Sequence, residues 1–189
     1  MQKPFYQGKL DTFCAIYAVL NALRLTHGIR TLKARDLLNL TLLKLAADPA
    51  ALRAVLAQDT DYIDLVDDLL NMAGQRFPIH IHKPFSEADK PSPEALWNTC
   101  RTWLDGGTPR AVVLRFLRSL KPTAPPLSRH WTTVDRMNND TLHLFDSSHD
   151  AEAILNIRKS AFVTRQEHVD EARLIYIQPS SLRFLRLPF

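Results

Sequence analysis

The hydrophobic residues of this chain follow a helical period in the first half and a strand period in the second. From Cys14 to Leu23 the apolar positions recur at intervals of three and four residues, which predicts a helix with one buried face. Two or three further helices are expected between residues 34 and 72, and another follows a proline-rich segment. Pro, Asp, Ser and Gly residues typical of helix ends set their predicted bounds at 34–46, 49–57, 61–72 and 93–104.

Alternating apolar and polar residues predict strands, which cluster toward the C-terminus. The expected strands are 77–82, 110–118 and 173–178, and 153–163 is interpreted as a covering segment. The terminal residues 183–189 alternate apolar and basic side chains and are expected to pair at a sheet edge. Helices followed by strands predict an α+β fold. In it a mainly helical half (1–107) packs against a mainly antiparallel sheet (108–189) within a single domain.

One pair of strands is predicted from its turn. Residues Asn138 to Asp140 are turn-forming, and their flanks are rich in β-branched and aromatic residues, which predicts a β-hairpin. His130 opens the first strand and Asp146 closes the second, so the two side chains are expected to be neighbours. Taken singly, His130 is a strand-edge histidine and Asp146 a turn-capping aspartate. Taken together, they form the pair that a nucleophilic thiol needs, a base and the group that orients it.

Cys14 is the candidate nucleophile. Either Asp11 or Thr12 can cap the helix, so Cys14 falls in the first turn, where unpaired backbone N–H groups and the helix dipole favour a thiolate. Gln7 lies one loop upstream, and its amide can donate to an oxyanion beside the sulfur. The alternative for Cys14 is a buried cysteine that only packs.

Composition narrows the function classes. The chain has 189 residues, 46% of them hydrophobic, which fits one globular domain. Its formal net charge of +4 is spread along the chain without a basic run, so nucleic acid is not an expected partner. No apolar stretch is long enough to span a membrane, and no signal peptide is recognised. The two cysteines favour a reducing compartment, so we expect a cytoplasmic protein, or one exported without a cleaved signal.

Two other features have their own interpretations. Cys100 lies between Trp97 and Trp103 on one helical stripe, and we interpret it as a core thiol whose pKa is raised by burial. His80 and His82 are two residues apart on one strand face, which is metal-ligand spacing, but no cysteine or carboxylate cluster accompanies them. Edge-strand histidines are the alternative, and neither a metal nor a cofactor is predicted.

Together these residues resemble a known family. Gln7, a helix-opening Cys14, a distant His130–Trp131 at the start of a hairpin and Asp146 at its end are similar to the papain-like cysteine peptidase superfamily. The bacterial C39-like branch is the nearest likeness. The resemblance implies that Cys14 is the nucleophile, His130 the general base and acid, and Asp146 its orienter. It also implies that Gln7 and the backbone N–H of Cys14 form the oxyanion hole.

The resemblance implies hydrolysis of a peptide or amide bond in a protein or peptide substrate, through a thioester acyl-enzyme. The same residues support glutamine deamidation or transglutaminase-like acyl transfer by an effector, and a non-catalytic papain-like module would bind a peptide in the cleft. Arg129 stands where these proteins often have Gly, and it is expected to narrow the cleft or to serve an acidic substrate group. The proline-rich loop 122–126 is expected to border the cleft.

Overall fold

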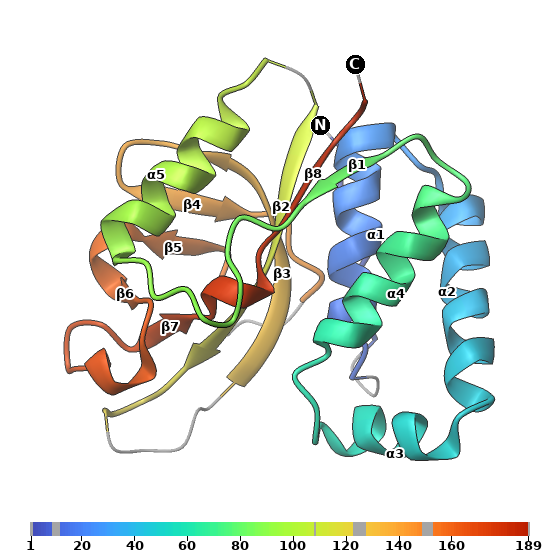
Figure 1. Cartoon of the computed structure of the whole chain (residues 1–189), viewed down its shortest axis with the longest axis horizontal. Coiled ribbons are helices and arrows are strands. Elements are labelled where there is room, and N and C mark those ends of the chain that lie inside the picture. The colour runs from blue at the N-terminus through green and yellow to red at the C-terminus, as the bar shows by residue number, and fades with distance from the viewer. Residues whose placement is uncertain (1, 9–11, 108, 123–127, 149–152, 189) are drawn as a thin grey trace.

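The computed structural model describes residues 2–8, 12–107, 109–122, 128–148 and 153–188. Within these ranges the chain forms five α-helices and one sheet of eight strands (Figure 1). The helices are α1 (Cys14–His27), α2 (Thr31–Ala46), α3 (Pro49–Ala57), α4 (Ile63–Gly74) and α5 (Pro93–Leu104). The strands are β1 (His80–His82), β2 (Arg110–Arg118), β3 (Ser128–Met137), β4 (Thr141–Leu144), β5 (Asn156–Arg158), β6 (Phe162–Val163), β7 (Ile175–Ile177) and β8 (Arg183–Arg186).

The helices begin and end where local signals place them. Asp48 caps α3 by accepting from two backbone N–H groups, with Pro49 at the first helical position, and α3 has its predicted bounds. Ser92 caps α5 by accepting from the Ala95 backbone N–H, and the predicted bounds of α5 are also confirmed. Gly28 ends α1 in a left-handed conformation at φ 62°, which glycine adopts without steric cost. None of the described helices has both the length and the apolar character needed to cross a bilayer.

The sheet is built around β2. The strand order is β1-β8-β2-β3-β4-β5, with β7 also pairing with β2, and β6–β7 is the one parallel pair among the described strands. The predicted hairpin is confirmed as β3 and β4. The C-terminal strand pairs as expected, but the prediction of an edge position is wrong. The short strand β1 pairs with its outer side, so β8 lies between β1 and β2.

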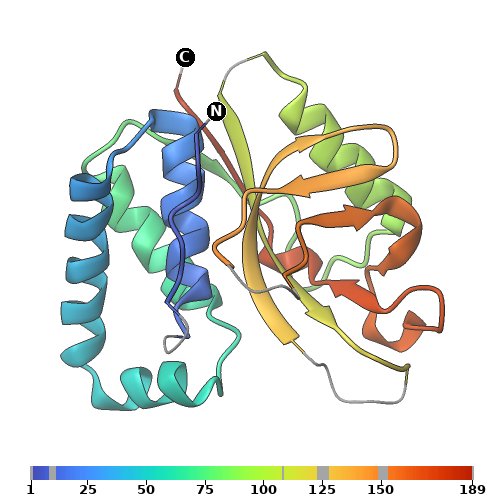
Figure 2. The same ribbon diagram turned by 180° about the vertical axis from the view of Figure 1, so that it is seen from behind.

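The two faces of the sheet carry different helices. Helix α1 packs on one face with α2 and α4, and its apolar residues share a core with Trp131 and Leu185. Helix α5 packs on the other face, where Trp97 and Cys100 join the cluster of Leu114 and its neighbours. Figures 1 and 2 show α1–α4 together on one side and α5 on the opposite side. Cys100 is the predicted core thiol, and burial raises its pKa to about 12.

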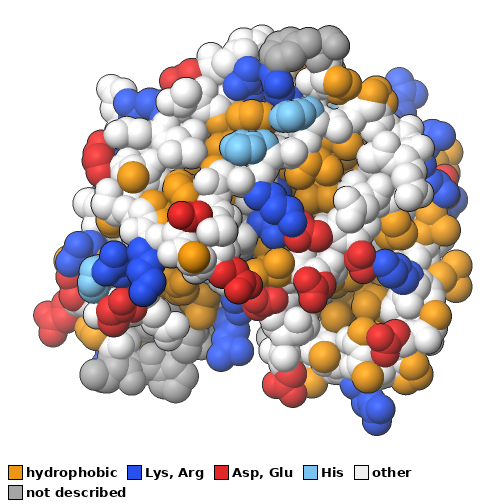
Figure 3. All heavy atoms as spheres, in the orientation of Figure 1, with side chains coloured by type: hydrophobic (Ala, Val, Ile, Leu, Met, Phe, Trp, Pro, Cys, Tyr) orange, Lys and Arg blue, Asp and Glu red, His pale blue; other side chains and the backbone are white. Residues whose placement is uncertain are grey.

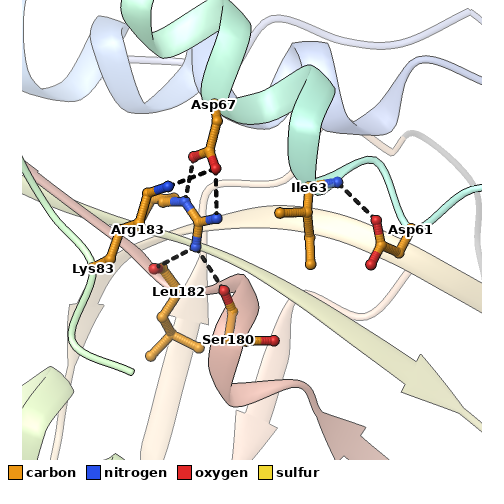
Figure 4. Close-up of polar contacts among 7 residues, drawn as sticks. All are labelled: Asp61, Ile63, Asp67, Lys83, Ser180, Leu182 and Arg183. Atoms are coloured by element: carbon orange, nitrogen blue, oxygen red, sulfur yellow. Dashed lines mark hydrogen bonds and ion pairs between the residues drawn. The ribbon is translucent and has the colours of Figure 1, made fainter. Parts of the chain in front are cut away.

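A buried ion pair joins the helical side to the sheet. The Arg183 guanidinium on β8 donates from Nε to Asp67 Oδ1 on α4 at 2.6 Å and from Nη2 to Oδ2 at 3.0 Å (Figure 4). Its Nη1 donates to the carbonyls of Ser180 and Leu182, and Lys83 Nζ donates to Asp67 Oδ2 at 2.6 Å. Burial raises the pKa of Asp67, but these cations outweigh it and hold the pKa below its usual value.

Candidate active site

Cys14 is the first residue of α1, and its side chain is buried, with 8% exposed. The predicted cap at Thr12 is wrong. The N-cap is Phe13, which makes no side-chain capping bond, and the Thr12 hydroxyl instead donates to the Val55 carbonyl at 3.3 Å. Asp11 lies outside the described residues. With no side-chain cap, the positive end of the helix dipole faces the thiol.

Asp146 is held as a carboxylate just after β4. Its Oδ2 is 2.8 Å from His130 Nε2 and also accepts from the Thr132 hydroxyl, and its Oδ1 accepts from the Ser148 backbone N–H at 2.7 Å. Only 1% of the Asp146 side chain is exposed, and burial by itself raises a carboxyl pKa. The hydrogen bonds and the charge of His130 outweigh burial, so the pKa of Asp146 is lowered and the group is ionised.

His130 on β3 joins this carboxylate to the thiol. Because Nε2 interacts with Asp146, Nδ1 is the ring nitrogen left to interact with the Cys14 thiol. Burial lowers the pKa of His130, but hydrogen bonds to Asp146 and Cys14, together with their negative charges, raise it to about 10. The imidazole is therefore protonated at neutral pH. The edge of the ring packs against Phe116, with centroids 5.6 Å apart, which helps to fix its orientation.

A β-bulge places the Asp146 side chain on the same face of the sheet as His130. The pairing of β3 with β4 shifts by one residue at Asp135, and beyond it the Phe145 N–H donates to the Thr133 carbonyl at 2.7 Å. On this shifted register Thr132 lies opposite Asp146, and residues opposite each other share a sheet face. Without the extra residue Asp146 would lie opposite Thr133 and point to the other face, away from the imidazole.

The N-terminal segment brings Gln7 to the site. Asn21, fully buried in mid-helix, accepts from the Phe5 N–H at 2.6 Å and donates to the Phe5 carbonyl at 3.1 Å. The segment therefore runs along α1 (Figure 2). The Gln7 N–H then donates to the Ser147 carbonyl at 2.9 Å. Gln7 lines the same pocket as the thiol and the imidazole.

The pocket has a volume of about 140 Å³. Besides the three candidate residues, its described lining is Thr12, Gln58, Thr60, Tyr62 and Arg129. Figure 3 shows the molecular surface hollowed at its lower edge, between the helical side and the sheet side.

The α3–α4 loop forms one wall of this pocket. Gln58 and Tyr62 both have positive φ, at 58° and 64°, and for a bulky residue such as Tyr62 this is a strained conformation. The Tyr62 hydroxyl donates to the Val55 carbonyl at 2.8 Å, and burial followed by the charge of Cys14 raises its pKa. Trp131 Nε1 donates to the Asp61 carbonyl at 2.8 Å, which ties the loop to β3.

Several residues of this site were not predicted from the sequence. Thr132 carries a usable signal, because it lies two residues after His130 and so faces the same side of the strand. Ser148 contributes a backbone N–H, which any residue except proline supplies. Tyr62 and Gln58 enter the site through loop geometry that no local pattern indicates. The loop expected at 122–126 lies almost wholly outside the described residues.

His80 and His82 are not part of this site. Both imidazoles lie against the Trp103 ring, with centroids 6.5 and 6.3 Å away, and His82 also meets the edge of Phe184. In the part of the chain that the structure describes, no group of three or more His, Cys, Asp or Glu side chains is arranged to hold a metal ion. The histidines are aromatic packing partners of Trp103.

Comparison with known proteins gives no indication of function, so a function is inferred from the geometry of this site. No protein-family model matches the chain, and no curated protein does. The structure shows an α+β chain in which a helix-opening thiol and an imidazole line one pocket, and a buried carboxylate contacts that imidazole.

Proposed function

We propose that this protein is a papain-like cysteine peptidase or amide hydrolase, with Cys14 as nucleophile, His130 as acid and base, and Asp146 as the group that orients His130. One observation carries the proposal. Cys14 opens α1 and lines the same pocket as His130, whose Nε2 lies 2.8 Å from the buried Asp146 carboxylate. This is the relation of nucleophile, base and orienter that covalent acyl transfer requires.

The chemistry proceeds in two halves. The Cys14 thiolate attacks the carbonyl carbon of the scissile amide, and the Cys14 backbone N–H and the Gln7 side-chain amide stabilise the oxyanion. The His130 imidazolium then protonates the leaving amine as the C–N bond breaks, which leaves a thioester. In the second half His130 takes a proton from water, the hydroxide equivalent attacks the thioester, and the Cys14 sulfur leaves.

The arrangement of the chain supports the papain-like assignment. The order Gln7, Cys14, His130, Asp146 is that of the superfamily that the sequence resembles. The nucleophile lies at the N-terminus of a buried helix, and the histidine and aspartate lie on an antiparallel hairpin packed against that helix. The positions of the three groups agree with the roles that the resemblance implies.

A second candidate is hydrolysis or transfer at a side-chain amide, as in glutamine deamidation. The observation that favours it is the size of the pocket at the thiol, about 140 Å³. Ligand pockets usually measure roughly 300–1,000 Å³, so this one suits a single inserted side chain better than a length of peptide. Ammonia release from a glutamine-containing protein, measured beside cleavage of an unfolded protein, separates the two reactions.

The first test is alkylation of the thiol by iodoacetamide from about pH 4 to about pH 9, followed by mass spectrometry of the labelled peptide. We expect Cys14 to react fast at acidic pH, because a thiolate paired with imidazolium persists there, and to slow by roughly a hundredfold in His130→Ala. Cys100 serves as an internal control, since its pKa of about 12 keeps it unreactive. Slow labelling of Cys14 that does not respond to His130 contradicts the proposal and leaves a peptide-binding module.

A further inference from the structure

Two arginines lie close together on the sheet face that meets α1. In the β2–β3 pairing Arg115 lies opposite Trp131, and Leu117 lies opposite Arg129. Opposite residues share a face and side chains alternate along a strand, so Arg115 and Arg129 are diagonal neighbours on one face. Trp131 packs in the core cluster that contains α1, so this is the face on the nucleophile's side of the sheet.

The two charges are unequally compensated. Arg115 Nη1 donates to Gln178 Oε1 at 2.6 Å. Burial lowers the pKa of Arg115, the charge of Asp61 opposes that shift, and the charge of Arg129 adds to it. Arg129 is exposed, and no described residue forms a hydrogen bond or ion pair with it. A positive charge that has no partner among the described residues therefore lies beside a second one.

The charge of Arg129 lies beside the proposed nucleophile. Arg129 lines the pocket that holds Cys14 and His130, and Cys14 also interacts electrostatically with Arg115. The remaining described lining is uncharged, from Gln7 and Thr12 to the α3–α4 loop. Like charges on neighbouring strands are destabilising, and such a local conflict is expected where a ligand relieves it. A bound anion is the kind of ligand that relieves a conflict between two positive charges.

We infer that Arg129, backed by Arg115, is a specificity residue that binds a carboxylate of the substrate next to the carbonyl group that Cys14 attacks. The inference rests on the proposed function, because it takes the Cys14 pocket as the reaction site. A guanidinium holds a carboxylate through two parallel hydrogen bonds, which fixes the orientation of the substrate as well as its charge. The carboxylate belongs to an acidic side chain or to the C-terminus of a peptide.

Two alkylating reagents that differ only in charge test this without a known substrate. With iodoacetate and with iodoacetamide alike, the Cys14 sulfur attacks the methylene carbon, a C–S bond forms, and the C–I bond breaks to release iodide. Only iodoacetate carries a carboxylate next to the reacting carbon. The measured quantity is the ratio of the two rate constants at Cys14, at low salt and neutral pH, for each variant.

Arg129→Gln is expected to lower the iodoacetate-to-iodoacetamide ratio by at least about threefold, the effect of one charge across roughly 7 Å in water-like surroundings. Arg129→Lys keeps much of the ratio because it keeps the charge. Arg136→Gln, an exposed arginine at the far end of β3, is the matched control and leaves the ratio unchanged. The effect of Arg129 is expected to fade in about 1 M salt, where the screening length drops to about 3 Å.

The outcomes separate this inference from the proposed function. If labelling of Cys14 is fast and depends on His130, but the reagent ratio does not depend on Arg129, the proposed function stands and carboxylate recognition is overturned. Slow labelling that ignores His130 overturns both. An equal fall in the ratio for Arg129→Gln and Arg136→Gln assigns the effect to net charge and also overturns the inference.

Matched peptides then identify the source of the carboxylate. In one pair Glu replaces Gln beside the scissile bond, and in the other a C-terminal acid replaces the amide. If Arg129 recognises a carboxylate, Arg129→Gln is expected to raise KM for the acidic peptide of one pair and to leave KM for its neutral partner unchanged. Equal KM changes for all four peptides contradict it.

Discussion

Among single residues, Asp146 has the densest set of polar partners in the site. One oxygen accepts from the Thr132 hydroxyl and from His130, and the other accepts from the Ser148 N–H. A buried carboxylate with this many donors stays ionised, and an ionised carboxylate keeps the imidazole charged and correctly turned. The Thr132 hydroxyl is the donor that can be removed with least change of shape.

Replacing Thr132 by Val is expected to slow alkylation of Cys14 by roughly three- to tenfold, since a hydrogen bond to a charged group contributes about 1.5–3 kcal/mol and part of it acts on the site. Thr133→Val is the matched control. The Thr133 hydroxyl donates to the Ala18 carbonyl at 2.6 Å on the opposite face, so its loss costs stability without touching Asp146. Urea unfolding and labelling rates measured on both variants check this, and equal slowing in the two would contradict it.

At the scale of elements, the site depends on how α1 is held against β3. Cys14 opens α1 and His130 lies on β3, so any sliding between the helical side and the sheet separates them. Thr133 and Ala18 tie the two elements directly, and the buried pair of Asp67 and Arg183 ties α4 to β8. Arg183 is only 2% exposed, so its charge depends on Asp67 for compensation.

Asp67→Ala is expected to lower the free energy of unfolding by about 2–4 kcal/mol, because it leaves a buried guanidinium with only carbonyl partners. Lys83→Gln removes the exposed partner of the same carboxylate and is expected to cost no more than about 1 kcal/mol. Urea titrations of both variants measure the difference. Equal losses would mean that the exposed and buried contacts contribute alike, contrary to this expectation.

At the scale of the whole molecule, the charged site couples stability to pH. The folded pKa of His130 is raised to about 10, above its unfolded value near 6.5. Its contribution is therefore fully present below about pH 6.5 and is lost as the pH rises through about 10. The pKa of Asp146 is lowered, so its contribution is present above the unfolded value near about 3.9 and is lost in acid.

The difference in unfolding free energy between the wild type and His130→Gln should therefore be largest between about pH 4.5 and about pH 6.5. It should shrink from about pH 6.5, where the unfolded state loses its proton, to about pH 10, where the folded imidazole loses its own. Urea unfolding at a series of pH values measures it, and subtracting the variant removes the titration of the other groups. A difference that stays constant from pH 6 to pH 10 would show that the pKa of His130 is not raised.

Much of the secondary structure and the candidate residues could be predicted because the signals are local. The bounds of α3, α5 and β2 follow from caps, prolines and apolar periodicity within each segment. The hairpin follows from its turn, and from the hairpin alone His130 and Asp146 were expected to be neighbours. These signals act between residues close in the chain, where backbone geometry links spacing directly to contact.

What only the tertiary structure decided involves partners distant in the chain. The sequence does not indicate that Phe13 takes the cap position, that α5 crosses to the other face of the sheet, or that β1 covers β8. The bulge at Asp135 and the strained Tyr62 are likewise set by long-range packing. A one-residue shift of register changes the face on which Asp146 lies, and the free energy that selects the shift comes from burial against the whole molecule. The sequence therefore determined which side chains are candidates for the site, and the packing of the sheet against α1 decided that they meet.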